Sequence, residues 1–112
     1  MALDTAAEMV NQARILTQDL VQPYRYSDQE FLDALNTGIL ESKRIRPDMW
    51  PNGLPSDYLA VDTTPITIDP MYRMAFVYYM CGQAQLRDEE ETQDTRAVML
   101  LQMFYKQLMG LG

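Results

Sequence analysis

The chain has 112 residues, of which 47% are hydrophobic, and its net charge is −7 at pH 7. This length predicts one domain, and the apolar content is typical of a globular protein rather than a disordered one. The acidic balance excludes simple binding to nucleic acid or to an anionic membrane surface, because both need clustered Lys and Arg.

The first two of four predicted helices lie at about 5–21 and 28–46. Thr5 with Glu8 and Ser27 with Glu30 have the spacing of capping boxes, in which a hydroxyl and a glutamate satisfy the first backbone amides. A proline follows each helix and ends it. Gly38, inside the second helix, would allow a neighbouring helix to approach closely. The apolar stripes are Ala6, Met9, Ala13, Leu16 and Leu20 on the first helix and Phe31, Leu35, Gly38, Ile39, Ser42 and Ile45 on the second.

Residues 47–69 are predicted to form a long loop, because they contain four prolines and an Asn-Gly turn signal. Connections of this length are usually functional. Two pieces, 59–61 and 66–68, have the character of extended segments, which either pair as a short hairpin or add to a neighbour's sheet edge. We expect the loop to be exposed in an isolated subunit and covered in an assembly. Its candidate interface residues are Trp50, Tyr58, Ile66 and Ile68, with Trp50 alternatively an anchor that holds the loop on the core.

The third and fourth helices are predicted at about 70–87 and 93–109. Asp69 is the expected N-cap of the third helix, and Pro70 its first residue. This helix is apolar nearly all round, which favours a central position or cover by another subunit. The fourth helix begins inside the acidic run 88–94, with Thr92 or Asp94 as the cap. Its apolar stripe is Ala97, Leu101, Phe104, Leu108 and Leu111.

The residue types do not indicate catalysis or metal binding. Histidine is absent from the sequence, so Ser/His and Cys/His nucleophile pairs and the Glu-x-x-His metal sites of helical bundles cannot form. Cys81 lies in an apolar run and is interpreted as a small buried hydrophobe. The acidic run lacks the spaced ligands and the glycine of a calcium loop. We predict no enzymatic activity, no cofactor and no metal site; the sequence also lacks a signal-peptide pattern and a membrane-length apolar run.

Two further groups of residues are candidates for contacts with other chains. The fourth helix carries more apolar side chains than one core face needs, which predicts a surface for a neighbouring subunit or another partner. Basic residues cluster at the end of the second helix, where they either form intersubunit ion pairs or complement the helix dipole. The apolar group is Met99, Met103, Tyr105 and Met109, and the basic group is Lys43, Arg44 and Arg46.

The order and spacing of several short patterns resemble the head-to-tail adaptor proteins of tailed bacteriophages, also called connector or head-completion proteins. The resemblance covers about residues 5–109, almost the whole chain. The patterns are Leu35-Asn36-x-Gly38-Ile39, then Arg46-Pro47-Asp48, a long proline-containing loop, Pro70-x-x-Arg73-x-Ala75 and an acidic turn before the last helix.

This resemblance implies an all-α fold, a small four-helix bundle whose copies form a ring below the portal, usually a dodecamer. The ring would extend the DNA channel, let DNA pass without specific binding and dock a tail or nozzle protein. The implied location is the head–tail interface of the virion, after assembly in the host cytoplasm. No catalysis and no membrane contact are implied.

Two other classes of protein fit the same composition. One is an acidic helical inhibitor of the phage type that mimics DNA and acts as a small oligomer, which would need carboxylates spread over one face. The other is a dimeric helical regulator that acts on its own. Particle mass in solution, with and without a portal, distinguishes them from an adaptor.

Overall fold

A computed structural model describes residues 3–17, 26–51, 53, 58, 65–86 and 91–110, with residues 91–95 described by their backbone. These residues form four α-helices, α1 (Ala6–Thr17), α2 (Asp28–Ile45), α3 (Arg73–Leu86) and α4 (Glu91–Leu108). Two short 3-10 helices, η1 (Pro47–Met49) and η2 (Pro70–Tyr72), flank the central loop. No strand occurs in the described part of the chain, so the prediction of an all-α fold is confirmed.

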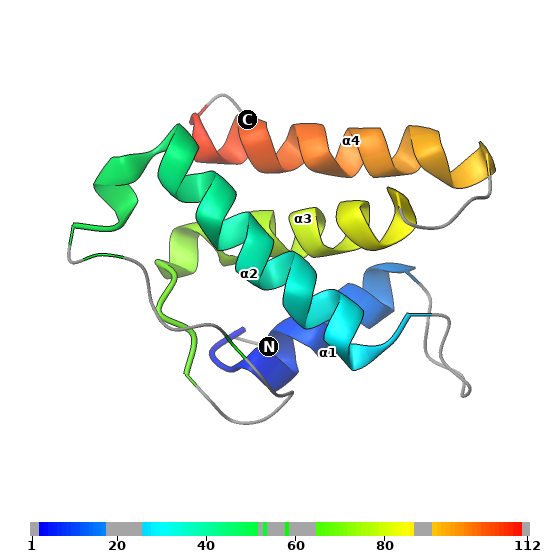
Figure 1. The fold of residues 1–112 in the computed structure, drawn as a ribbon, viewed down its shortest axis with the longest axis horizontal. Helices are drawn as coiled ribbons and strands as arrows, with labels where there is room; N and C mark the ends of the chain where they lie inside the picture. The colour runs from blue at the N-terminus through cyan, green and yellow to red at the C-terminus, as the bar shows by residue number, and fades with distance from the viewer. Residues whose placement is uncertain are drawn as a thin grey trace.

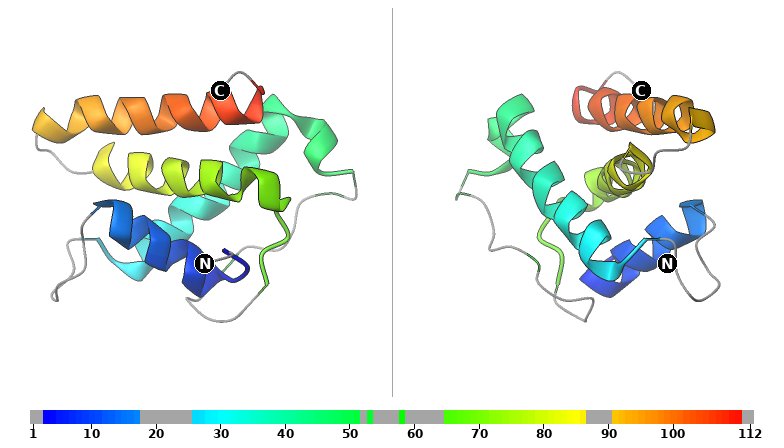
Figure 2. Two further views of the ribbon diagram at one scale, coloured as in Figure 1. Left: turned by 180° about the vertical axis from the view of Figure 1, so that it is seen from behind. Right: turned by 45° about the vertical axis from the view of Figure 1, so that its right-hand side comes forward.

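Helix α3 is the centre of the molecule, as its apolar circumference predicts, since it contacts α1, α2 and α4. Helices α3 and α4 lie side by side and run antiparallel, and α1 lies on the opposite side of α3 from α4 (Figure 1). Helix α2 crosses this layer obliquely, which is clearest when the molecule is turned (Figure 2). An aligned four-helix bundle is therefore not confirmed, although the same four helices share one core.

The helix starts follow the local signals of the sequence in three of four cases. Both Ser27 and Thr5 accept a hydrogen bond from the backbone amide three residues later, at 3.1 and 3.2 Å. The Asp69 carboxylate accepts from the amide of Met71 at 3.0 Å, although the first turn here is 3-10 rather than α-helical. The fourth helix starts at Glu91, before both predicted caps, Thr92 and Asp94.

The predicted hairpin is not confirmed. Residues 59–61 lie outside the described residues, and the other segment pairs elsewhere. The amide of Ile66 donates to the carbonyl of Asp4 at 2.8 Å, and Pro65 forms an isolated antiparallel bridge with Thr5. The end of the loop therefore joins the N-terminal segment, because unpaired backbone groups are available there.

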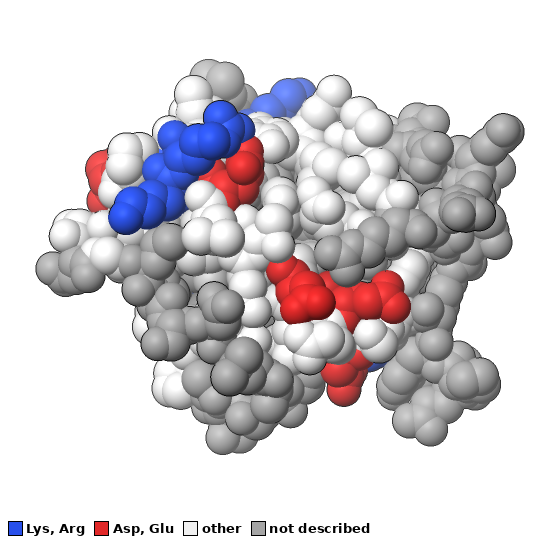
Figure 3. Space-filling model, in the orientation of Figure 1, with Lys and Arg blue, Asp and Glu red and all other residues white. Residues whose placement is uncertain are grey.

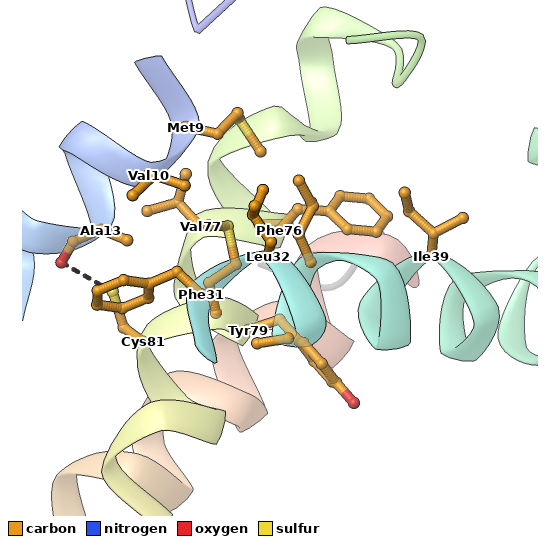
Figure 4. Close-up of a cluster of buried hydrophobic side chains, with 14 of the residues drawn as sticks. Met9, Val10, Ala13, Phe31, Leu32, Ile39, Phe76, Val77, Tyr79 and Cys81 are labelled. Atoms are coloured by element: carbon orange, nitrogen blue, oxygen red, sulfur yellow. Dashed lines mark hydrogen bonds between the residues drawn. The ribbon is translucent and has the colours of Figure 1, made fainter. Parts of the chain in front are cut away.

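The core is built from the described residues of the predicted stripes of α1 and α2 packed on α3 (Figure 4). Leu20 and Leu111, the last residues of the stripes predicted for the first and fourth helices, lie outside the described residues. Phe31 of α2 and Phe76 of α3 are fully buried. The Cys81 thiol donates a hydrogen bond to the Ala13 carbonyl at 3.4 Å, which joins α3 to α1. On the other side of α3, the ring of Phe104 lies 5.4 Å from that of Phe76, centroid to centroid, in an edge-to-face arrangement.

Two glycines allow the helices to come this close. A Cβ added at Gly38 of α2 would lie 2.9 Å from the Tyr79 ring on α3. A Cβ added at Gly82 of α3 would lie 2.9 Å from Leu101 Cγ and 3.1 Å from the Ala97 carbonyl oxygen on α4. The close approach predicted at Gly38 is thus observed, and Gly82 of α3 allows α4 to approach α3 in the same way.

Buried Cys81 makes stability depend on pH in the alkaline range. Burial raises the pKa of Cys81 to about 12, whereas an unfolded thiol titrates at about 8.5. Between these values the unfolded chain loses this proton and the folded chain keeps it, so the free energy of unfolding falls as pH rises, by up to about 1.4 kcal/mol per pH unit. Below the unfolded pKa, this contribution is constant.

Urea unfolding of wild type and Cys81→Ala under reducing conditions checks this prediction. We expect the stability advantage of the wild type over the variant to shrink as pH rises above about 8.5. Parallel stability curves for the two proteins would contradict it, because tyrosine and lysine titration is common to both.

Candidate assembly surface

Helix α4 uses one face for the core. Ala97, Phe104 and Leu108 are fully buried at a spacing that returns to the same side of the helix. Leu100 is buried beside them, and Leu101 is partly buried. Since α4 packs mainly on α3, much of its opposite side is exposed among the described residues.

That opposite side carries a set of exposed apolar residues, which we call the α4 surface: Val98, Met99, Met103, Tyr105 and Met109. Met99 and Met109 are more than half exposed, at 58% and 56%, and Met103 and Tyr105 are each 37% exposed. All four residues predicted as an interface from the sequence are therefore accessible. Single exposed apolar side chains are common, but a group of five on one helix is typical of a contact surface.

Helical spacing arranges the α4 surface in two strips. Val98, Tyr105 and Met109 are separated by 7 and 4 residues and share one strip, and Met99 and Met103 form the second. Gln102 and Lys106 lie between the strips by the same spacing. Methionine side chains adapt to irregular partners, so this surface is suited to more than one contact geometry.

Tyr105 is held in place by α2. Its hydroxyl donates to Glu41 Oε1 at 3.2 Å, and its ring lies edge-on to Phe104 at 5.4 Å. Glu41 also accepts from the guanidinium of Arg44, and this hydrogen bond lowers the pKa of Glu41. Burial raises the pKa of Tyr105, with the charge of Glu41 adding to the shift. The tyrosine is thus fixed as a neutral donor, so little side-chain entropy remains to be lost on binding.

The three residues of the predicted basic interface differ in their surroundings. Arg46 turns inward: it donates to the Tyr72 hydroxyl at 2.8 Å and to the Leu108 carbonyl at 2.9 Å, and it pairs with Asp48 at 2.7 Å. Its assignment as an interface residue is corrected, because it joins the end of α2 to the C-terminal carbonyls of α4, where a cation is favourable. Lys43 and Arg44 stay exposed on α2.

The predicted loop interface is also corrected. Trp50, Tyr58, Ile66 and Ile68 are all buried in the core of their own chain, and Ile68 is 1% exposed. The Trp50 indole donates to Ser42 Oγ at 2.9 Å, which makes it the anchor of the alternative interpretation.

Tyr58 is held by Asn36, whose side chain accepts from its amide at 2.9 Å and donates to its carbonyl at 3.0 Å. These contacts hold single loop residues on the helices, whereas other described loop residues are exposed: Pro47, Asp48, Pro51, Gly53, Pro65, Thr67 and Asp69. The expected exposure of 47–69 therefore fails at Trp50, Tyr58, Ile66 and Ile68. Helix α2 supplies the partners of the first two, and Asp4 and Arg73 bond to the backbone of the other two, which the loop sequence does not reveal.

Arg73 has a role that sequence reasoning missed. It donates to the carbonyls of Ile68 at 2.8 Å and Ile66 at 3.3 Å, and so holds the end of the loop. It also donates to the Leu3 carbonyl at 3.3 Å and pairs with Asp4 at 2.6 Å. The only sequence signal was its place in the Pro70-x-x-Arg73 pattern, which does not indicate its partners.

Other site types find little support in the described residues. No group of three metal-ligating side chains occurs among them, and none of their helices has the length and hydropathy of a membrane span. Residues 88–90 of the acidic run lie outside the described residues. A cavity of about 390 Å³ opens between η1 and η2, and its lining combines Arg46 and Asp48, which pair with each other, with apolar side chains. The other lining residues are Met49, Trp50, Pro51, Thr67, Asp69, Met71 and Tyr72.

Comparison of the chain with protein-family models, with curated proteins and with solved structures found no match. The α4 surface is therefore the feature of the described structure from which a function is inferred.

Proposed function

We propose that this chain is a structural subunit of a tailed-phage virion, a head-to-tail adaptor that assembles into a ring below the portal. The α4 surface carries the proposal. Its five apolar side chains are exposed on a helix whose other face is tightly packed, and contact with a portal or a neighbouring subunit would remove them from water. The resemblance of the sequence patterns to adaptor proteins supplies the class of partner.

Three other features support an assembling subunit. Partly buried arginines and hydrogen-bonded aromatic residues hold the ends of the loop on the helices, which favours a rigid building block. The net charge of −7 in each copy would give a ring a negative field, which repels phosphate and lets DNA slide past. A head-to-tail contact that closes on itself is the symmetry expected for such a ring.

The inhibitor class is less well supported by the described surface. In Figure 3 the carboxylates near the start of α2 form one group, and a basic group lies on the same face of the molecule. A DNA mimic needs carboxylates spread along a face that is free of competing cations. The adaptor is therefore the proposal we carry to experiment.

The double variant Met103→Gln/Met109→Gln tests the role of α4. Both side chains are exposed, so we expect the free energy of unfolding of the isolated chain to change by less than about 0.5 kcal/mol per site. Incorporation into particles is expected to be lost, which leaves DNA-filled or leaking heads without tails. Complementation of a phage that lacks the wild-type protein, followed by electron microscopy and infectivity, measures this result.

Met71→Gln/Ile15→Gln is the matched control, since it also replaces two exposed apolar residues but leaves α4 intact. We expect normal tailed particles from this control. Infectious tailed particles carrying the α4 double variant would contradict an adaptor role for this helix.

A further inference from the structure

Helix α2 has a solvent-facing stripe that the proposed adaptor contact does not use. Asp33, Thr37, Leu40 and Arg44 follow each other at spacings of 4, 3 and 4, so they lie on one side of the helix, away from the core. We call these four residues the α2 stripe. All four are exposed, and Leu40, at 61%, is among the most exposed large apolar side chains of the described structure.

The α2 stripe is charged with opposite sign at its two ends. Asp33 lies at the acidic end beside Asp28 and Glu30, and Arg44 lies at the basic end beside Lys43. Asp33 and Arg44 are 11 positions apart, which corresponds to about 16 Å along the helix axis. Figure 3 shows both charged groups on the same face of the molecule, with uncharged surface between them and with further carboxylates beside the basic group.

This placement determines how a second copy would fit. If two copies place their α2 helices antiparallel, the acidic end of each stripe lies opposite the basic end of the other. This arrangement is a two-fold symmetric contact between identical faces. We propose that the α2 stripe is a self-association surface, on which two copies of this chain pair antiparallel. Asp33 of each copy then meets Arg44 of the other, and Leu40 packs against Thr37 of the second copy at the centre.

The charged side chains retain bonding capacity for such a contact. Arg44 donates to Glu41 within its own chain, with Nε 3.1 Å from Oε1, but its side chain is still 69% exposed. A guanidinium has five N–H donors, so Arg44 retains N–H groups that can donate to a second carboxylate. Asp33 accepts from Gln29 at 2.7 Å, and a carboxylate has room for further donors. Asp28 is different, because it pairs with Arg14 in the same chain.

The contact is expected to be weak and sensitive to salt. Exposed ion pairs contribute little individually, and their attraction is screened over about 10 Å at 0.1 M salt. The inference does not depend on the adaptor proposal, because it uses α2 rather than α4.

Charge exchange across the two-fold axis gives a sharp test. Asp33→Lys alone puts a cation opposite Arg44 of the other copy, and Arg44→Glu alone puts a carboxylate opposite Asp33. Each like-charge contact occurs twice in a symmetric pair, so each variant is expected to be monomeric. In an equimolar mixture of the two variants, opposite charges face each other at both ends of the contact. The cation introduced at position 33 meets the carboxylate introduced at position 44, and the unchanged Arg44 of one chain meets the unchanged Asp33 of the other.

The geometry of that mixture follows from the two-fold axis. One chain carries cations at positions 33 and 44, and the other carries carboxylates at both, so both ion pairs return and a heterodimer is expected. Native mass spectrometry at low ionic strength distinguishes the species by mass, and circular dichroism checks that each variant is folded.

We expect each single variant to raise the dimer dissociation constant at least about tenfold, and the mixture to restore it. Met103→Gln/Met109→Gln is the matched control and should dimerise as the wild type does, which separates this inference from the adaptor proposal. The pairing is overturned if the wild type is monomeric, if either single variant still dimerises, if the mixture gives no heterodimer, or if Met103→Gln/Met109→Gln, which lacks the proposed α4 contact, associates beyond two chains.

Discussion

Phe104→Ala is expected to lower the free energy of unfolding by about 3–5 kcal/mol. Phe104 is fully buried between α4 and α3, and its ring lies 4.7 Å from that of Tyr79 and 5.4 Å from that of Phe76, centroid to centroid. The loss combines apolar transfer, aromatic contacts and the cavity that remains, because the helices cannot close around it. Urea denaturation followed by circular dichroism measures it.

Met99→Ala on the same helix is the control, since its side chain is 58% exposed and its loss should cost less than about 1 kcal/mol. A similar small change for Phe104→Ala would show that α4 does not pack on α3 through this residue. That outcome would also remove the reason for placing the α4 surface on the solvent side.

Arg73→Gln is expected to cost about 3 kcal/mol, because it leaves carbonyl oxygens of Ile66, Ile68 and Leu3 without their donor. The arginine side chain is only 12% exposed, so water replaces the lost bonds poorly. We also expect faster hydrogen exchange at the amide of Ile66, which bonds to Asp4. Denaturation and hydrogen exchange measure the two effects.

Asp4→Asn separates the ion pair from the backbone contacts. The Asp4 side chain is 62% exposed, and exposed ion pairs contribute about 0–1 kcal/mol. If Asp4→Asn destabilised the chain as much as Arg73→Gln, the ion pair rather than the bonds to carbonyls would hold the N-terminal segment. Equal exchange of Ile66 in wild type and Arg73→Gln would refute the proposed clamp.

The candidate site was partly accessible to sequence reasoning. Met99 and Met103 could be selected because they fall outside the single stripe that a helix needs for its core. Their exposure follows from that surplus, but their partner does not, and the contact stays a prediction. Leu40 and Asp33 were not selected, because an isolated exposed leucine and an ordinary carboxylate carry no signal until the structure shows them on one face.

The elements that the sequence determined by itself are those with short-range causes. Ser27 and Thr5 cap amides only three residues away, and the apolar stripes repeat within two turns, so these helices and their buried faces can be read locally. The tertiary structure alone decided what joins them. Asn36 meets Tyr58 across 22 residues, Arg46 meets Leu108 across 62, and Arg73 meets Leu3 across 70. Such partners depend on how the helices cross, which no local pattern specifies. For this reason the loop residues predicted as an interface are found in the core, and Arg46 and Arg73 bond to distant segments of their own chain.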